Sequence, residues 1–99
     1  MKFLALEVEN NGVNWAEVPQ SLLNAEARRV FDLQQDGFMR QIHFRADTRS
    51  AVIDWECESL EQVRELTASL PLVKAEFIHF DIIPLIPYPG FKRLFSDKE

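Results

Sequence analysis

The chain has 99 residues, of which 46% are hydrophobic, and this is enough for one domain with one modest core. Sixteen acidic residues against eleven basic ones give a net charge of -5, which argues against a nucleic-acid partner because phosphate binding needs a basic surface. No segment approaches the ~20 apolar residues of a membrane span. Cys57 is alone, which excludes an intramolecular disulfide and fits a buried thiol in a reducing compartment. We therefore expect a soluble, cytoplasmic protein that contacts no membrane.

The first strand is predicted over residues 3–9, because the segment is apolar and a turn cluster, Asn10-Asn11-Gly12, follows it. A helix is predicted next. Pro19 suits its first turn, and Gly37 suits the left-handed residue that ends it.

Residues 38–47 and 51–58 both alternate in polarity and are joined by the turn-forming run Asp47-Thr48-Arg49-Ser50, which predicts a β-hairpin. Ser59 then begins a second helix, with Gln62 three residues later in a capping-box pattern. Pro71 is expected to end that helix, and residues 73–85 are expected to form a long strand. Three prolines exclude this strand from the middle of a sheet: Pro84, Pro87 and Pro89.

The resulting order is βαββαβ, which predicts a ferredoxin-like α+β fold with a four-stranded antiparallel sheet and both helices on one face. The strand alternation assigns to the helix side Leu4, Leu6, Val8, Phe38, Ile42, Phe44, Ile53, Trp55, Cys57, Ile78, Phe80 and Ile82. The open face is predicted to carry Phe3, Ala5, Glu7, Met39, Gln41, His43, Arg45, Val52, Asp54, Phe77, His79, Asp81 and Ile83. An open face with this much apolar surface needs a partner, and a second copy packed sheet to sheet would cover it.

The second half of the chain resembles the muconolactone isomerase family, which is part of the dimeric α+β barrel superfamily. The matching positions are Glu58-Ser59, Glu65-Leu66, Leu70-Pro71-Leu72 and Asp81-Ile82, followed by a proline-containing tail. The resemblance implies two ferredoxin-like subunits with facing sheets, and assembly beyond the dimer. It also implies isomerisation of an unsaturated lactone without a metal or an organic cofactor.

The chain departs from the family in its second strand. Members of the family carry Trp-Pro-His-Leu-Trp where this sequence has residues 39–43, Met-Arg-Gln-Ile-His. His43 falls two positions from the family histidine, so no catalytic role is transferred to it. Residues 1–87 are predicted to form the domain and residues 88–99 a C-terminal arm, which clasps a dimer or covers a pocket.

Proton transfer at carbon needs a base, an acid and a group that holds enolate charge. The catalytic candidates on the predicted open face are His79, His43, Asp54 and Asp81. The substrate-binding candidates are Arg45, which suits a carboxylate, Glu7 and Gln41. Two histidines without a spaced carboxylate pattern do not predict a metal site. The alternative interpretation of the same residues is a satisfied polar network at a dimer interface.

The sequence therefore predicts a homodimer or higher oligomer that acts on a small molecule as a cofactor-independent isomerase. A non-catalytic ligand-binding or assembly module of the same architecture is the first alternative. A cofactor-free oxygenase is the second.

Overall fold

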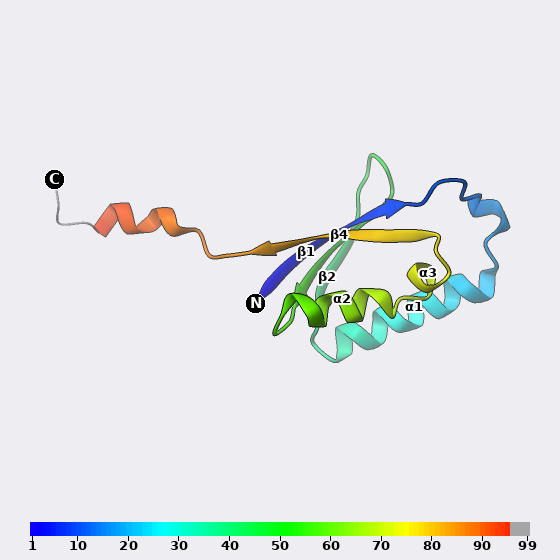
Figure 1. The fold of residues 1–99 in the computed structure, drawn as a ribbon, viewed down its shortest axis with the longest axis horizontal. Coiled ribbons are helices and arrows are strands. Elements are labelled where there is room, and N and C mark those ends of the chain that lie inside the picture. The colour runs from blue at the N-terminus through cyan, green and yellow to red at the C-terminus, as the bar shows by residue number, and fades with distance from the viewer. Residues whose placement is uncertain (96–99) are drawn as a thin grey trace.

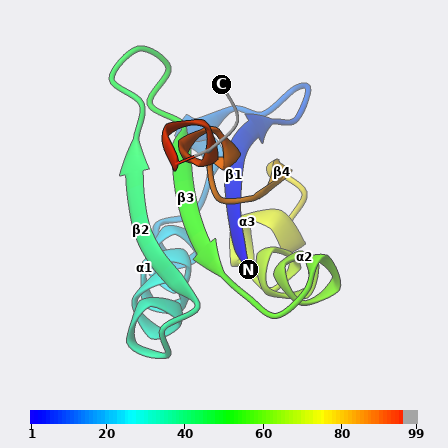
Figure 2. The ribbon, with the colours of Figure 1, turned by 90° about the vertical axis from the view of Figure 1, so that its left-hand side faces the viewer.

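The computed structural model describes residues 1–95 and confirms the ferredoxin-like α+β fold (Figure 1). The elements in chain order are β1 (Lys2–Glu9), η1 (Trp15–Glu17), α1 (Gln20–Gln35), β2 (Met39–Phe44), β3 (Ala51–Glu56), α2 (Leu60–Ala68), α3 (Pro71–Lys74), β4 (Ile78–Leu85) and η2 (Pro89–Phe95). The four strands form one antiparallel sheet in the order β2-β3-β1-β4. The helices cover one face of this sheet and leave the other face open (Figure 2).

The ends of the long helices follow the sequence signals. Gly37 takes a φ of +87° just after α1, a left-handed conformation that suits a residue without a side chain. At the start of α2, the Ser59 hydroxyl accepts a hydrogen bond from the Gln62 amide at 3.1 Å. The Gln62 side chain accepts one in return from the Glu58 amide at 2.7 Å. These caps satisfy backbone groups that helix termini leave without partners.

The prediction of a strand from residue 73 was wrong at its start. Pro71 occupies the first turn of the short helix α3, where its missing N–H costs nothing, and β4 begins only at Ile78. Glu76, with a φ of +65°, turns the chain between the two elements. Proline therefore ends one helix and begins another. β4 is an edge strand, as its prolines required.

The core lies between the sheet and the helices. The side of β1 that faces this core is the one that was predicted to face away from it. Phe3 pairs with Trp55 and Ala5 with Ile53 on the helix side, while Leu4, Leu6 and Val8 line the open face. Both sides of β1 are apolar because it is a central strand, so alternation did not distinguish them. The strand β2 was also partly misassigned: Met39 is in the core, since a β-bulge between residues 39 and 41 interrupts the alternation.

One aromatic assignment changes as well. Phe77, predicted on the open face, precedes β4 and packs beside the small core cluster of Val18, Leu72 and Ile78. It lies before the strand begins, where the period of two does not hold. Phe44 pairs with the buried Ala51 and so lies on the helix side as predicted, but it is 66% exposed because it is the last residue of β2.

The C-terminal segment leaves the domain as an arm that extends beyond the sheet (Figure 1). Its large side chains are 62–80% exposed, and they are Ile86, Tyr88, Phe91, Leu94 and Phe95. Tyr88 and Phe91 contact each other edge to face, with ring centroids 4.9 Å apart. The arm therefore has local order but no cover from its own domain. Its predicted last four residues, 96–99, lie outside the described part of the chain.

Within residues 1–95, no helix is both long enough and apolar enough to cross a membrane.

Candidate active site on the open sheet face

The open face of the sheet is defined by the pairing of its strands, because directly paired residues point to the same side. Gln41 pairs with Asp54, and Asp54 pairs with Leu4. One pair further along, His43 aligns with Val52 and Leu6. The sequence prediction placed Gln41, His43 and Asp54 on one face, and the structure brings these three together on adjacent strands.

A hollow of about 360 Å³ lies at this end of the sheet. It is lined by Lys2, Phe3, Arg40, Gln41, Asp54, Trp55 and Leu85. Two cationic side chains, one carboxylate and one amide thus surround a space of small-molecule size. Leu85, the last residue of β4, marks the point where the arm leaves the domain. We call this space the Arg40 hollow.

Arg40 was not predicted, and the β-bulge explains why. Strict alternation would send it to the helix side, but the bulge lets Met39 and Ile42 pack into the core while Arg40 remains exposed. Its Nε donates to the Gly37 carbonyl at 2.7 Å, which fixes the base of the guanidinium. The terminal Nη groups have no hydrogen-bond partner among residues 1–95. They are the donors that bind a carboxylate in two-point geometry.

Lys2 is the second cation of the hollow. Its Nζ lies 3.3 Å from a Glu56 oxygen, and the N-terminal amino group of Met1 lies 2.7 Å from the other oxygen. The Met1 amino group and then Lys2 lower the pKa of Glu56 from its usual range. Glu56 therefore stays ionised near neutral pH and orients Lys2 at the edge of the hollow.

Arg45, the residue predicted to bind a carboxylate, lies elsewhere. It forms a two-point ion pair with Asp47 in the exposed β2–β3 connection, at 2.9 and 2.7 Å. Hydrogen bonding from Arg45 lowers the pKa of Asp47. The guanidinium is thus already occupied and does not line the hollow.

His79 and Asp81 lie on β4 at the opposite side of the open face. Asp81 pairs with Leu6, and His79 pairs with Val8, which is two further residues from the hollow. His43 and Asp81 are separated by three strand spacings, about 14 Å. The four predicted catalytic residues therefore form two groups within one subunit, with an apolar strip of Leu4, Leu6, Val8 and Val52 between them.

The hydrogen bonds of His79 define which of its ring nitrogens is available. The Asn10 amide nitrogen donates to the Glu76 carbonyl at 2.7 Å, so its oxygen faces His79. That oxygen lies 2.6 Å from His79 Nδ1, which must therefore carry the proton and donate. In neutral His79, Nε2 is left as an acceptor for a proton.

Glu7 was predicted on the open face, and the structure places it on the helix side. Its carboxylate accepts a hydrogen bond from the Ala51 amide at 2.9 Å. Glu26 of α1 accepts one from the Leu72 amide at 2.8 Å. Burial raises the pKa of both carboxyl groups, and the charge of Glu7 raises that of Glu26 further. The two carboxyl groups tie β3 and α3 to the domain, and neither lines the Arg40 hollow.

We predict that Glu26→Gln changes the pH dependence of stability. The stability of the variant relative to wild type is expected to be higher at pH 8 than at pH 4. The folded-state pKa of Glu26 is raised, so its contribution is fully present at low pH and is lost as pH rises through that pKa. Glutamine keeps the acceptor for Leu72 without the buried charge. Melting temperatures across this pH range measure the effect. Glu65→Gln, at an exposed position of α2, is the control. An equal pH dependence in both variants would contradict the prediction.

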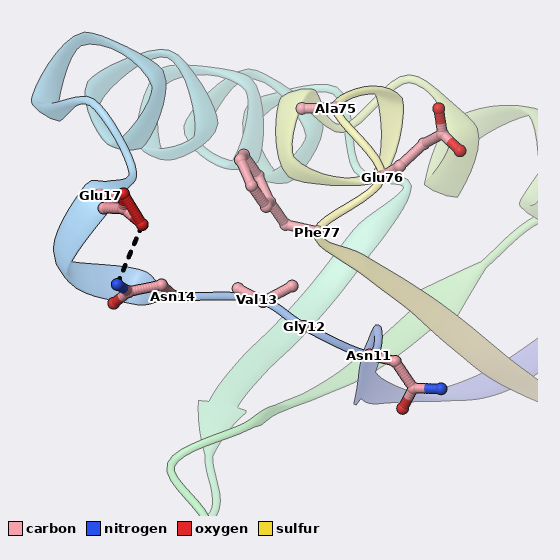
Figure 3. Close-up of a pocket in the computed structure, with 8 residues that line it drawn as sticks. All are labelled: Asn11, Gly12, Val13, Asn14, Glu17, Ala75, Glu76 and Phe77. Carbon is pink, nitrogen blue, oxygen red and sulfur yellow. Dashed lines mark hydrogen bonds between the residues drawn. The ribbon is translucent and has the colours of Figure 1, made fainter.

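A second hollow, of about 350 Å³, lies between the loop after β1 and the loop before β4 (Figure 3). Glu17 accepts a hydrogen bond from Asn14 there at 3.0 Å, while Glu76 points away from it (Figure 3). Its polar groups do not converge on a common point. Across residues 1–95, no group of three histidine, cysteine, aspartate or glutamate side chains is arranged to hold a metal ion.

The fold and the hollow define a ferredoxin-like α+β protein with a polar site on its open sheet face. The chain matches no protein-family model and no curated protein. Among solved structures it is similar to muconolactone isomerase, with a TM-score of 0.71 and 17% identity over 91% of this chain and 93% of that one. It is also similar to 5-chloro-2-hydroxyhydroquinone dehydrochlorinase from Burkholderia phenoliruptrix AC1100 in complex with 2,5-dihydroxybenzoquinone. There the TM-score is 0.66 and the identity 16%, over 91% of this chain and 98% of that one. At these identities the likeness establishes the shared fold.

Proposed function

We propose that the chain is a muconolactone isomerase-like enzyme that binds a small carboxylate-bearing compound in the Arg40 hollow. The carrying observation is the guanidinium of Arg40, fixed by Gly37 and unoccupied at its Nη groups, beside Asp54 and Gln41. Both similar structures are named as enzymes that act on small organic compounds. The volume of the hollow supports a small substrate, and the two cations in its lining support a negatively charged one.

The proposed reaction moves a carbon-carbon double bond by proton transfer. Arg40 and Lys2 hold the substrate carboxylate. Asp54 removes a proton from a carbon next to a carbonyl group, and the Gln41 amide donates a hydrogen bond to the enolate oxygen. His43, diagonal to Asp54 and thus about 7–8 Å away in the sheet, returns a proton to another carbon. One proton leaves and one returns, so no co-reactant is consumed.

The proposal includes a homodimer in which two open faces meet. The apolar strip of this face and the exposed side chains of the arm both need cover. A second copy supplies both surfaces at once. The arm begins at the Arg40 hollow, so a partner there affects the site as well as the assembly.

Arg40→Gln tests the binding site. We expect it to weaken the binding of muconolactone by roughly 10- to 100-fold, because a charge-assisted hydrogen bond contributes about 1.5–3 kcal/mol. Titration calorimetry measures the affinity. Arg45→Gln is the matched control, because Arg45 is occupied by Asp47 and should leave the affinity unchanged. Equal effects of the two variants would contradict the assignment of Arg40.

The second candidate is a non-catalytic ligand-binding module, and the separation of His79 and Asp81 from the hollow favours it. The two functions differ in one observable. An enzyme converts the bound lactone, which is followed by ultraviolet absorbance, whereas a binding module leaves it unchanged at the same saturation.

A further inference from the structure

One row of paired residues crosses the whole open face, and it ends in two unpartnered polar groups. The row runs from His43 on β2 through Val52 and Leu6 to Asp81 on β4. Both end residues are exposed, and neither side chain has a hydrogen-bond or ion-pair partner among residues 1–95. An imidazole and a carboxylate thus lie on the same level at opposite edges of the sheet.

The two edge strands are oriented to pair with those of a second copy. Each strand is antiparallel to its neighbour in the order β2-β3-β1-β4, so β2 and β4 run in opposite directions. When two sheets face each other about a two-fold axis parallel to the strands, β2 of one copy lies beside β4 of the other. This pairing is antiparallel and keeps every row at its own level. It also closes the two free edges into a barrel.

We infer that His43 in each subunit contacts the partner's Asp81, so that the active site is complete only in the dimer. This inference rests on the proposed function, which takes the open face as the contact between copies. The two groups are chemically complementary, since a carboxylate accepts a hydrogen bond from an imidazole N–H.

The partner's Asp81 is then a positioning residue. By holding one ring nitrogen of His43, it sets the tautomer and directs the other nitrogen along β2 toward Gln41, Asp54 and the Arg40 hollow. This arrangement of an acid/base group held by a third group is the one that proton-transfer sites generally need. It also accounts for the placement of His43 and Asp81 about 14 Å apart within a single subunit.

Disulfide trapping tests the contact directly. His43→Cys protein mixed with Asp81→Cys protein is expected to form a covalent dimer on non-reducing gels, while each variant alone does not. A disulfide needs Cα atoms within about 7 Å. The matched control mixes Gln41→Cys with His79→Cys, which lie on rows about 13 Å apart along the strands and should not cross-link. Cys57 is buried and remains in place. The inference is overturned if the control pair cross-links and the test pair does not, or if neither pair cross-links.

A second measurement does not depend on cysteine variants. His43→Gln and Asp81→Asn should each weaken the dimer by roughly tenfold, and the double variant should be no weaker than either single one, because all three lose the same contact. Additive effects overturn the inference. Lactone binding, which depends on Arg40, is measured separately. If the contact between His43 and the partner's Asp81 is not found but lactone still binds, the site shared between two subunits is ruled out and the proposed function still stands.

Discussion

Trp55→Ala is expected to cost about 3–5 kcal/mol of folding free energy, which is a large share of the roughly 5–15 kcal/mol that stabilises a typical domain. Trp55 is 1% exposed and lies between Phe3 on β1 and Met39 on β2, at the centre of the helix-side core. Removing the indole leaves a cavity that its neighbours cannot fill, because they are held by the sheet pairing. Urea denaturation followed by circular dichroism measures the loss.

Trp55→Phe is the matched control for that substitution. The Trp55 indole N–H is buried and has no hydrogen-bond partner within the described residues 1–95. Phenylalanine removes this unsatisfied donor, whose burial costs about 1–3 kcal/mol, and keeps most of the aromatic surface. We therefore expect a small change, within about 1.5 kcal/mol of wild type. Equal losses for alanine and phenylalanine would show that the indole N–H contributes to stability and would contradict this view of the core.

Deleting residues 88–99 is expected to weaken the dimer by at least roughly 100-fold while the domain keeps its folded structure, as measured by circular dichroism. The arm extends away from its own domain (Figure 1), so its loss removes few contacts within the subunit. Each large apolar side chain that a partner buries contributes about 1.5–3 kcal/mol, and the described arm carries several. Sedimentation equilibrium measures the association.

Two point variants in the arm make this test sharper. Phe91→Ser removes an exposed aromatic side chain and should weaken the dimer, whereas Lys92→Ser changes the adjacent charged position and should have little effect. A deletion that leaves the dimer unchanged would show that the arm does not clasp a partner.

The fold was predictable because its signals are local. The Ser59 cap, the Gly37 helix end and the hairpin spacing each specify a backbone conformation with few alternatives, and the order of elements then limits the topology. The prolines likewise identified β4 as an edge strand. The short helix α3 was missed because Pro71 both ends one helix and begins another.

The site was harder to predict because it depends on which side each strand presents. Gln41, Asp54 and His43 were placed on the correct face, since β3 alternates clearly between apolar and polar residues. Glu7 was not, because β1 is apolar on both sides and a one-residue shift in phase inverts it. Arg40 was missed because a β-bulge breaks the alternation. The adjacent polar pair Arg40-Gln41 within a strand is the signal that would have indicated the bulge.

The sequence pattern of one chain does not indicate which residues meet between two copies. The register of the strand pairing limits which residues can do so. His43 and Asp81 share a row only because β1, β3 and both edge strands pair in one particular register. No sequence spacing links residues 43 and 81. Their proposed meeting in a dimer comes from the sheet order and from the antiparallel relation of its edges.

The most direct test of the Arg40 hollow is a titration of ¹⁵N-labelled protein with muconolactone, followed by two-dimensional NMR. We predict that the largest amide shifts occur at Lys2, Arg40, Gln41 and Asp54, and that Arg40→Gln strongly reduces them at a lactone concentration near the wild-type dissociation constant. Shifts confined to the second hollow around Asn11 and Glu76, or no shifts at all, would contradict the placement of the site on the open sheet face.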